Sequence, residues 1–408
     1  MEVTPGIRRD PVPDLDAVGH DEGLATRIHD EIARDGPITF ARFMGLALYD
    51  PDGGYYRAET ARPGREGDFL TAPEAHPIFG AALARAVADT WYRFDRPEAF
   101  VLREYGAGTG TLAIAVLDGL ARERPELATR LHYDPIEVES RRLAAIASRL
   151  EAAGHGDALV ERDRTGTPIV GFVLANEVLD ALPVHRVVVR DGVLREVLVG
   201  SQDGAFVDVE AKPTTASLAA RLVAESVELA EGQRAEICLA LGPWMAEAAA
   251  GLERGVLLLI DYGYPAAELY DPIRRRDGTL RAYLRHRVHD DPYIHVGRQD
   301  LTAHVDVTAV ERAAGAVGLE HLGTTTQAEF LVGLGTEDLL RAIQADPANT
   351  LEDYLAVRSA LMRLLDPGAM GRFRVMAFAR DWPAGPPLAG LGYRLGAAAT
   401  GRRPEARQ

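Results

Sequence analysis

The stretch that decides the fold of this chain is Phe100-Val101-Leu102-Arg103-Glu104-Tyr105-Gly106-Ala107-Gly108-Thr109-Gly110. It opens with an apolar run and closes on alternating glycines, and a helical pattern over 113–120 follows it. A strand, a tight turn and a helix in this order form half of a βαβ unit, and glycines in the turn let a ligand approach the backbone. The stretch therefore predicts a ligand-binding loop at the edge of a parallel sheet.

The spacing of these glycines discriminates between classes of cofactor. A dinucleotide fingerprint, G-x-G-x-x-G, needs glycine where this chain has Thr111, and a phosphate-binding P-loop needs a lysine that the stretch lacks. An acid two positions before G-x-G-x-G instead resembles motif I of the class I methyltransferases that use S-adenosylmethionine (SAM). Glu104, Gly106, Gly108 and Gly110 are therefore candidate SAM-binding residues, and a plain glycine-rich turn is the alternative interpretation.

The remainder of the chain favours the same fold class. Short apolar runs alternate with helical stretches, which predicts βαβ units and a parallel sheet. Strands are expected at 100–102, 131–136, 169–175, 256–260 and 373–378, and helices at 40–48, after a cap at Thr39, and at about 77–94. Two stretches interrupt the alternation. The turn Asp191-Gly192 between two valine-rich runs predicts a β-hairpin, and the polar residues 265–308 are expected to be irregular.

An acid follows the second predicted strand. In nucleotide-binding α/β folds, an acid at this position holds ribose hydroxyls. Glu137 is the candidate for this role, and Glu139, two residues further on, is the alternative. Both acids could instead stabilise the start of the next helix.

Polar residues also follow the run 169–175. Asn176, Glu177 and Asp180 would lie at the carboxyl edge of the sheet, where open α/β folds bind ligands. They could bind the methionine part of the cofactor, orient a substrate amine or take its proton. Capping of the following helical turn is the alternative interpretation.

Composition and charge exclude several classes of function. The chain has 408 residues, 47% of them hydrophobic and 26% charged, which is ordinary for a globular protein with a large core. A net charge of −16 disfavours nucleic acids and anionic membrane surfaces as partners. The single cysteine, Cys238, excludes an intrachain disulfide and favours a reducing compartment. No apolar run approaches the roughly 20 residues that span a bilayer, and residues 1–16 show no targeting pattern, so we expect a cytoplasmic protein without membrane insertion.

The chain resembles the MidA / DUF185 family of methyltransferases over nearly its whole length. The blocks that carry the resemblance occur in order, and several lie outside the generic fold. They are 43–44, 48–49, 54–56, 67–69, 71–74, 176–177, 180–183, 261–263, 278–281, Tyr283, His286, Gly297, 300–306, 326–327 and 330–331. The resemblance implies an α/β fold of class I, with a Rossmann-like, seven-stranded methyltransferase sheet, and S-adenosyl-L-methionine as cofactor. It adds Thr71 and Asn176 to the candidate SAM-binding residues.

The resemblance also implies a domain organisation and a class of substrate. Mitochondrial members of the family are complex I assembly factors linked to symmetric dimethylation of arginine in a complex I subunit, so a protein or peptide substrate is expected. The predicted parts are a flexible arm at 1–20, an N-terminal helical region at 21–97, a SAM-binding core at 98–264 with a β insert at about 184–245, a polar insert on the substrate side at 265–335, a C-terminal helix and last strand at 336–382, and a mobile tail at 383–408.

Methyl transfer to arginine would depend mainly on alignment and desolvation of the acceptor. A guanidinium stays protonated near neutral pH, and a pair of carboxylates can hold it and draw positive charge away from the attacking nitrogen. Glu177 and Asp180 are the predicted pair, with Glu74 and Asp68 as alternatives.

The polar insert supplies the third catalytic candidate. His286 could line the acceptor pocket as a base, and His304 is its alternative. The insert also permits a metal hypothesis, but its spacing matches no recognised ligand pattern, so no metal is predicted. The residues concerned are His286, His289, His295, His304, Asp290, Asp291, Asp300 and Asp306. Tyr55 and Tyr56 could belong to a substrate cage, although core positions are the simpler reading.

Three functions remain at this stage. The leading one is a SAM-dependent protein arginine methyltransferase. The second is a small-molecule N- or O-methyltransferase on the same scaffold, which a closed cavity rather than a peptide-width groove would favour. The third is a non-catalytic assembly chaperone that keeps the SAM fold. A chaperone would not need the acids around Asn176, so their presence beside the motif glycines favours catalysis.

Overall fold

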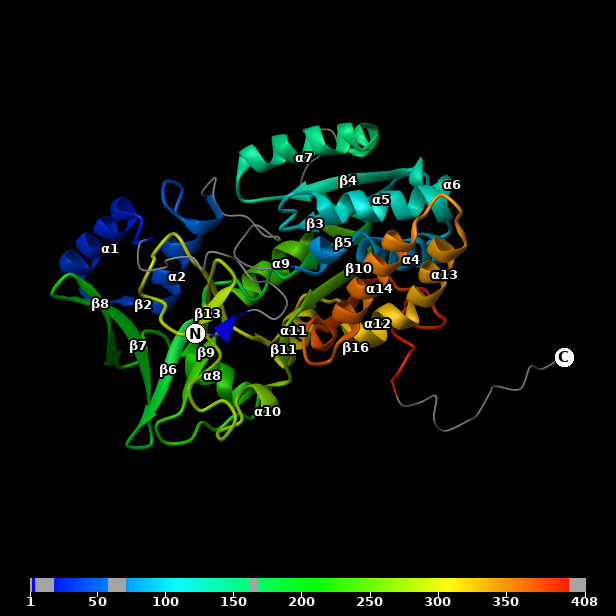
Figure 1. The fold of residues 1–408 in the computed structure, drawn as a ribbon. Helices are drawn as coiled ribbons and strands as arrows, with labels where there is room; N and C mark the ends of the chain where they lie inside the picture. Colours follow the sequence, from blue (N-terminus) through cyan, green and yellow to red (C-terminus); the bar gives the residue numbers. More distant parts are fainter. Residues whose placement is uncertain (1, 4–17, 58–70, 161–166, 396–408) are drawn as a thin grey trace.

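The computed structural model describes residues 2–3, 18–57, 71–160 and 167–395. An α/β core lies beside a second region, which is built from the N-terminal helices and a smaller sheet (Figure 1). The central sheet of the core has the strand order β16-β17-β10-β5-β3-β4. These strands are β3 (Phe100–Tyr105), β4 (Leu131–Ile136), β5 (Ile169–Asn176), β10 (Leu252–Asp261), β16 (Glu320–Thr326) and β17 (Arg374–Arg380).

The predicted βαβ alternation is confirmed in this sheet. β3 pairs in parallel with β4 and β5, and β5 pairs in parallel with β10, whereas β17 is antiparallel to both β10 and β16. The family resemblance implies a seven-stranded sheet, and the described residues form a sheet of six strands. At the free edge of β4, Leu159 forms a single bridge to Tyr133, and residues 161–166 lie outside the described part of the chain.

Alternating residues of the strands cover the two faces of the sheet. In β10, Val256, Leu258 and Ile260 pack toward one set of helices, and Leu257 and Leu259 pack toward another. This is the period-two pattern of a strand that is buried on both faces. The first face holds α4 (Ile78–Arg93), α5 (Thr111–Glu123), α7 (Ser140–Ala152), α12 (Gln327–Gly333) and α14 (Leu351–Leu365), and the second holds α9 (Leu241–Ala250) and α11 (Val307–Ala316).

The second region confirms two local predictions. The Thr39 hydroxyl accepts a hydrogen bond from the amide of Arg42 at 3.1 Å and caps α2 (Phe40–Tyr49). The turn Asp191-Gly192, with both φ angles positive, joins β6 (His185–Arg190) to β7 (Val193–Gln202). The sheet is completed by β2 (Ile38–Thr39), β8 (Ala205–Ala211) and β9 (Arg234–Ile237). The helix α1 (Glu22–Asp35) packs with α2 against this sheet, so the β insert and the N-terminal helices share one core.

The polar insert is more regular than the sequence predicts. Its backbone groups pair in short strands, since a buried segment must satisfy its N–H and C=O groups. These strands are β11 (Gly263–Tyr264), β12 (Arg281–Leu284), β13 (Arg287–His289), β14 (Asp300–Thr302) and β15 (Val305–Asp306), and β1 (Glu2–Val3) pairs with β13. The remaining elements are η1 (Tyr55–Arg57), α3 (Ala72–Ala75), α6 (Pro125–Ala128), η2 (Gly156–Ala158), α8 (Ser217–Ala224), α10 (Ala266–Leu269) and η4 (Met370–Arg372).

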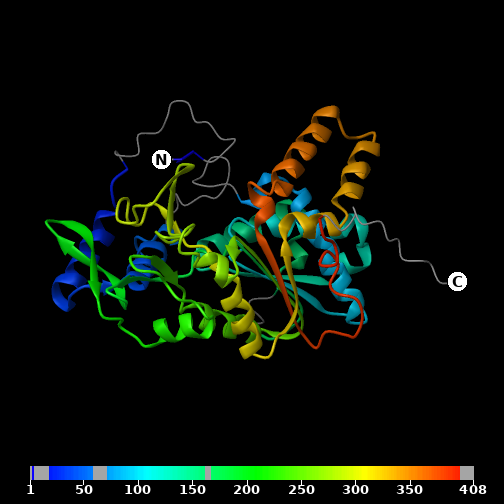
Figure 2. The same cartoon turned by 90° about the horizontal axis from the view of Figure 1, so that it is seen from below.

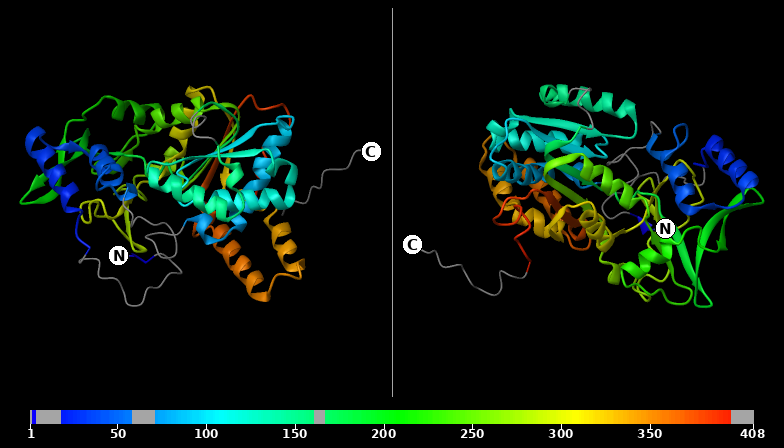
Figure 3. Two further views of the ribbon diagram at one scale, coloured as in Figure 1. Left: turned by 90° about the horizontal axis from the view of Figure 1, so that it is seen from above. Right: turned by 180° about the vertical axis from the view of Figure 1, so that it is seen from behind.

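Two expectations for the C-terminal part differ from the structure. A pair of helices, α13 (Thr336–Ala345) and α14, stands where one helix was predicted, and it projects from the core (Figure 2). Residues 383–395 do not form a free tail, because Leu388 and Leu391 are buried against the core. This return of the chain to the body of the protein is visible from two further sides (Figure 3). In the described ranges we find no helix with the length and apolar character needed to cross a membrane.

Candidate active site

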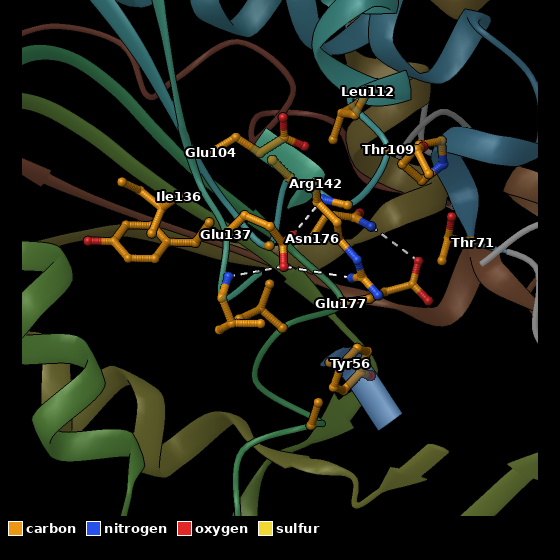
Figure 4. Close-up of a pocket in the computed structure, with 18 of the residues that line it drawn as sticks. Tyr56, Thr71, Glu104, Thr109, Leu112, Ile136, Glu137, Arg142, Asn176 and Glu177 are labelled. Carbon is orange, nitrogen blue, oxygen red and sulfur yellow. Dashed lines mark hydrogen bonds and ion pairs between the residues drawn. The ribbon is translucent and has the colours of Figure 1, made fainter. Parts of the chain in front are cut away.

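A cavity of about 340 Å³ lies at the carboxyl ends of β3, β4 and β5 (Figure 4). Open α/β sheets bind their ligands at this edge, and the volume is typical of small-molecule sites. The lining combines the loops after the strands with parts of α2, η1 and α3 from the N-terminal region. The carboxyl and amide side chains that line it are Glu74, Glu104, Glu137, Asn176 and Glu177.

The loop after β3 brings its backbone to the cavity. Gly106, Gly108 and Gly110 have φ angles of 67°, 56° and 75°, in the left-handed region that disfavours side chains. A Cβ atom at Gly106 would lie 2.8 Å from Cγ2 of Val178. Gly106 and Gly108 line the cavity, whereas Gly110 is the N-cap of α5 and is not part of the lining. Two of the predicted glycines therefore face the cavity and the third shapes the turn.

Glu104 is held under this loop. The hydroxyl of Tyr133 donates a hydrogen bond to its Oε2 at 2.6 Å, and burial raises the pKa of Glu104 to about 7. The acid that precedes the glycines is therefore anchored to the neighbouring strand β4 and is available on the cavity wall.

The structure distinguishes between the two acids that follow β4. Glu137 lines the cavity, and its Oε2 accepts a hydrogen bond from the amide of Gly108 at 2.9 Å. Arg142 lies 3.7 Å from the other oxygen of Glu137 (Figure 4). Glu139 does not line the cavity, because it caps α7 and bonds to Arg141. Glu137 is therefore the acid that a ligand in this cavity would meet.

Asn176 and Glu177 lie together at the end of β5. Oε1 of Glu177 accepts hydrogen bonds from Nδ2 of Asn176 at 3.1 Å and from the amide of Ala72 at 3.3 Å (Figure 4). Glu177 has a φ angle of 53°, an unusual conformation for a residue with a side chain, and such outliers concentrate at functional sites. Oδ1 of Asn176 is buried with no hydrogen-bond partner in the described part of the protein.

Glu74 faces the same part of the cavity from α3. Its Oε2 is also buried and unpartnered among the described residues, and burial raises the pKa of Glu74 to about 7. The pKa of Glu177 rises to about 8, mainly through burial and also through the nearby charges of Asp180 and Glu74. Thr71, the N-cap position of α3, lines the cavity next to Glu74. Glu74 and Glu177 therefore share the cavity as carboxyl groups that protonate near neutral pH, as Glu104 does.

Asp180 and His286, two of the three predicted catalytic residues, are not part of the cavity lining. Asp180 is buried, it interacts with the Tyr262 hydroxyl, and burial raises its pKa. His286 is buried in the turn between β12 and β13, with a φ angle of 63°. Asp68, an alternative to Asp180, lies outside the described residues. Of the predicted carboxylate candidates, Glu177 and Glu74 are the ones that the structure brings together.

Asp261 explains why the segment with Asp180 turns away from the cavity. Its Oδ2 accepts hydrogen bonds from the amides of Val178, Leu179 and Asp180, at 3.1, 2.8 and 3.3 Å. This carboxylate at the end of β10 fixes the turn after Glu177, so Glu177 points to the cavity while Asp180 is directed into the protein. In the sequence, Asp261 was visible only as part of a family block.

The histidines of the polar insert do not form a metal site in the described structure. Across the described ranges, no group of three or more His, Cys, Asp or Glu side chains is placed to hold a metal ion. His304, the alternative base, does not line the cavity, and burial with three nearby arginines lowers its pKa to about 3.

Sequence reasoning found part of the aromatic wall, because it considered Tyr55 and Tyr56 for a substrate cage and assigned Tyr49 to the core. Tyr49, Tyr55 and Tyr56 line the cavity, with Tyr56 packed against both of the others. The hydroxyls of Tyr49 and Tyr56 donate to the carbonyl of Ala181 and to Asp300, at 2.9 and 2.8 Å. The turn Gly53-Gly54 is the signal that singled out Tyr55 and Tyr56, and it does not extend to Tyr49. Arg142 and Trp244, which also line the cavity, carried no signal in the sequence.

Comparison with known proteins supports the chemistry of this cavity. Residues 82–325 match the model of a family described as "Putative S-adenosyl-L-methionine-dependent methyltransferase". The chain is 31% identical to the Drosophila melanogaster protein named protein arginine methyltransferase NDUFAF7 homolog, mitochondrial, over 87% of this chain and 84% of that protein. The human protein arginine methyltransferase NDUFAF7, mitochondrial, is 29% identical over 85% of this chain and 81% of its own length.

Solved structures show the same fold. A COG1565 superfamily member from Burkholderia thailandensis, crystallised with S-adenosyl-homocysteine, is 34% identical, with a TM-score of 0.82 over 95% of this chain and 99% of its own. A native crystal structure from the same organism is 35% identical, with a TM-score of 0.81 over 93% and 97% of the two chains. Similarity of this extent covers both the core and the N-terminal region that completes the cavity.

Proposed function

The chain belongs to this family of S-adenosyl-L-methionine-dependent methyltransferases, and from that premise we propose that it methylates arginine side chains of a protein. The cofactor is S-adenosyl-L-methionine. The acceptor is the proposed part: relatives at 26–31% identity carry the name protein arginine methyltransferase, and the carboxyl groups in the cavity suit a cationic acceptor.

The residues of the cavity fit the cofactor. Oδ1 of Asn176 is a buried acceptor without a hydrogen-bond partner in the described chain, as the ammonium group of the methionine part requires. Glu137 would hold the ribose hydroxyls, and the left-handed glycines Gly106 and Gly108 leave room for close approach to the backbone. Thr71 and Glu104 are the further polar contacts that we propose. When bound, the cofactor supplies an electrophilic methyl group on a sulfonium.

The observation that carries the proposed acceptor is the pairing of Glu177 with Glu74. Both carboxyl groups line the cavity, and the charge of Glu74 contributes to the raised pKa of Glu177. A bound guanidinium would favour the ionised form of both carboxyl groups. Because a guanidinium has only hydrogen-bond donors, both carboxylates would accept charge-assisted hydrogen bonds from it. The unpartnered Oε2 of Glu74 and the second oxygen of Glu177 are therefore suited to receive its N–H groups.

The same carboxyl groups can manage the proton of the reaction. Transfer of the methyl group to a guanidinium nitrogen would break its bond to the sulfonium sulfur, which would leave as a neutral thioether. One N–H proton would also have to leave so that the product carries a single positive charge. Burial raises the pKa of Glu177 to about 8 in the free protein, a bound guanidinium would ionise this carboxyl, and the ionised carboxylate can accept that proton. The rings of Tyr49 and Tyr56, with their hydroxyls bonded elsewhere, would add cation–π contacts to the acceptor.

The test uses methyl-labelled SAM, the purified protein and a lysate from a strain that lacks the gene. We expect label in protein, recovered after hydrolysis as methylated arginine, and about a hundred-fold slower labelling with the Glu177→Gln variant. Label recovered on a small molecule would favour the second function considered above, and label on lysine would contradict the proposed acceptor. A folded protein that binds SAM but transfers no methyl group would favour the assembly chaperone.

We also propose the cytoplasm as the location of the reaction. The single cysteine, Cys238, is partly buried, and burial raises the pKa of its thiol to about 11, so the thiol is unreactive and gives no sign of an oxidising compartment. The relatives named above are mitochondrial by name.

A further inference from the structure

Three arginines gather around His304 in the polar insert. His304 follows β14, and its ring lies 5.0 Å from the ring of Tyr262 and 5.6 Å from that of Tyr264, centroid to centroid. The guanidinium carbon of Arg275 lies 4.6 Å from the centroid of Tyr264. Arg281 begins β12 and is paired in register with Thr302, two residues before His304. Arg372 of η4 precedes Phe373, whose ring lies 5.5 Å from that of Tyr262, centroid to centroid. The three arginines therefore come from separate segments that meet at this group of rings. We call these three residues the arginine cluster.

The arginine cluster has no counter-charge at ion-pair distance. Within the described ranges, none of the three guanidinium groups forms a salt bridge or a hydrogen bond to a carboxylate; Arg281 donates only to the carbonyl of Leu280, at 2.7 Å. The charge of Arg275 acts on Asp271, whose Oδ1 accepts hydrogen bonds from the amides of Ile273 and Arg274. Arg372 is exposed and Arg275 and Arg281 are partly buried, so a ligand from solvent can reach them.

Burial lowers the pKa of His304, and the positive charge of the arginine cluster contributes to this shift. Besides burial, the positive charges of Arg275, Arg281 and Arg372 all lower the pKa of His304, which is therefore neutral at physiological pH. The chain has a net charge of −16, so three positive charges beside one neutral ring are a local excess of positive charge. Like charges that share a site repel one another, and an anion between them would relieve that repulsion.

The cluster is connected to the acceptor side of the cavity. Tyr262, which contacts His304, interacts with Asp180, and Tyr283 of β12 is paired in register with Asp300 of β14. Asp300 accepts the hydroxyl of Tyr56, which lines the cavity. Tyr262 therefore contacts both His304 and Asp180, and β14, which precedes His304, holds the acceptor of the Tyr56 hydroxyl.

We propose that the arginine cluster is an anion subsite that binds the carboxylate of an acidic residue in the methyl-acceptor protein. This inference rests on the proposed function, because it gives the acceptor a second recognition element. The arginine of such a substrate would bind Glu177 and Glu74, and its acidic residue would bind the arginine cluster. The acidic remainder of the surface would repel the same acidic residue elsewhere, which would fix the register of the peptide.

A direct binding experiment tests the subsite without any methyl transfer. Protein labelled with ¹⁵N-histidine and saturated with S-adenosyl-homocysteine is titrated with glutarate, and the ring signals of His304 are assigned with the His304→Gln variant. We expect a saturable shift of the His304 signals in the wild type. The shift should weaken by about ten-fold in apparent affinity in Arg281→Gln and in the exposed variant Arg372→Gln.

Matched controls decide whether the response belongs to the cluster. Arg358→Gln removes an exposed arginine of α14 and should leave the titration unchanged, and the neutral analogue glutaramide should give no shift. The inference is overturned if glutarate leaves His304 unperturbed, or if Arg281→Gln and Arg372→Gln respond like the wild type. Inorganic phosphate is titrated in parallel. A response to phosphate without a response to glutarate would mean that the cluster binds a phosphoryl group and not a carboxylate, which would overturn the proposal.

A kinetic arm links the subsite to the acceptor. With an arginine peptide that the enzyme methylates, replacing its acidic residues by glutamine should raise KM about five- to ten-fold in the wild type and leave KM unchanged in Arg281→Gln. Equal KM values for both peptides in the wild type would refute the link. If glutarate binds the cluster but no arginine is methylated, the proposed function has failed and the anion site stands, so the two failures are distinguishable.

Discussion

The two sides of the cavity are built in different ways. The glycine-loop side comprises Glu104, Gly106, Gly108 and Glu137, which lie at or directly after two adjacent strands. The carboxyl side comprises Tyr49, Tyr55, Tyr56, Glu74 and Glu177. It depends on contacts between distant parts of the chain: Ala72 and Glu177 are 105 residues apart, and Tyr49 and Ala181 are 132 apart.

This difference in construction suggests that one side of the cavity binds the cofactor and the other selects the acceptor. The glycine-loop side is formed by local backbone geometry, which any sequence with the same turn reproduces, and it suits a cofactor that the whole family shares. The carboxyl side needs the N-terminal helices to dock on the core, so changes in those helices alter the acceptor site without altering the turn. We therefore expect mutations on the glycine-loop side to act on SAM affinity and mutations on the carboxyl side to act on turnover.

The largest effect is expected at Gly106. The Gly106→Val variant should lose SAM affinity by about a hundred-fold or more, because the new side chain meets Val178 and enters the space of the ligand at a positive φ angle. Calorimetric titration with SAM measures the change.

Gly192 supplies the matched control for backbone strain. It has a φ angle of 69°, against 67° for Gly106, and a Cβ atom there would meet nothing within 4 Å. Gly192→Val, in the hairpin turn between β6 and β7, should lose similar stability and keep its SAM affinity. Equal loss of affinity in both variants would show that strain, and not the cavity, is responsible.

The next largest effect is expected on the carboxyl side. Glu177→Gln keeps the shape of the side chain and its hydrogen bonds from Asn176 and Ala72, yet removes the charge and the proton acceptor. Turnover should fall about a hundred-fold, with SAM affinity within about two-fold of the wild type. Labelled transfer and calorimetry together check this split. A parallel loss of SAM affinity would mean that the two sides of the cavity are not separable.

The sequence predicted the glycine-loop side well because its signals are local. The order of strand, glycines and helix around Gly106, and the acid after β4, follow from backbone geometry within a short stretch. The carboxyl side was predicted less well. Glu177 was identified, but Asp180 was chosen as its partner because it is close in sequence, and the hydrogen bonds from three amides to Asp261 turn that segment away from the cavity.

Arg103 illustrates the same limit within the sheet. The sequence predicts a strand at 100–102, since a charged residue normally ends a buried run, but β3 continues to Tyr105. The buried guanidinium of Arg103 bonds to Asp134 at 2.7 Å and to the carbonyl of Gly251 at 3.0 Å. Its partners are distant in sequence, so no local pattern could show that this charge is satisfied inside the protein.

A smaller effect distinguishes the two acids after β4. Glu137→Gln should weaken SAM binding about ten-fold, because a carboxylate that accepts hydrogen bonds is replaced by a neutral amide. Glu139→Gln is the matched control: it changes the N-cap of α7, outside the cavity, and should leave SAM affinity unchanged. The reverse result, with the loss at Glu139, would move the ribose contact to that residue and shift the boundary of the glycine-loop side.

The smallest effect concerns pH, and it compares the two sides directly. Burial raises the pKa of Glu177 to about 8 and that of Glu104 to about 7 in the folded protein, above the ordinary value of 4.5. Carboxyls of this kind stabilise the fold fully below their unfolded pKa, and this stabilisation is lost as the pH rises through the folded value. The thermal midpoint of the ligand-free protein should therefore fall by a few degrees between pH 6 and pH 9.

Variants that keep the shape of the side chain show which side of the cavity causes the fall in the thermal midpoint. Glu104→Gln should remove one share of the fall near pH 7, where Glu74 also contributes, and Glu177→Gln the part that extends to about pH 8, because each variant is neutral throughout. Glu139→Gln should keep the wild-type profile in this range, since the pKa of Glu139 is lowered to about 2 by its bonds to Arg141. Identical profiles for the wild type and Glu177→Gln would mean that Glu177 is already ionised in the free enzyme, and the carboxyl side would then bind a cation without releasing a proton.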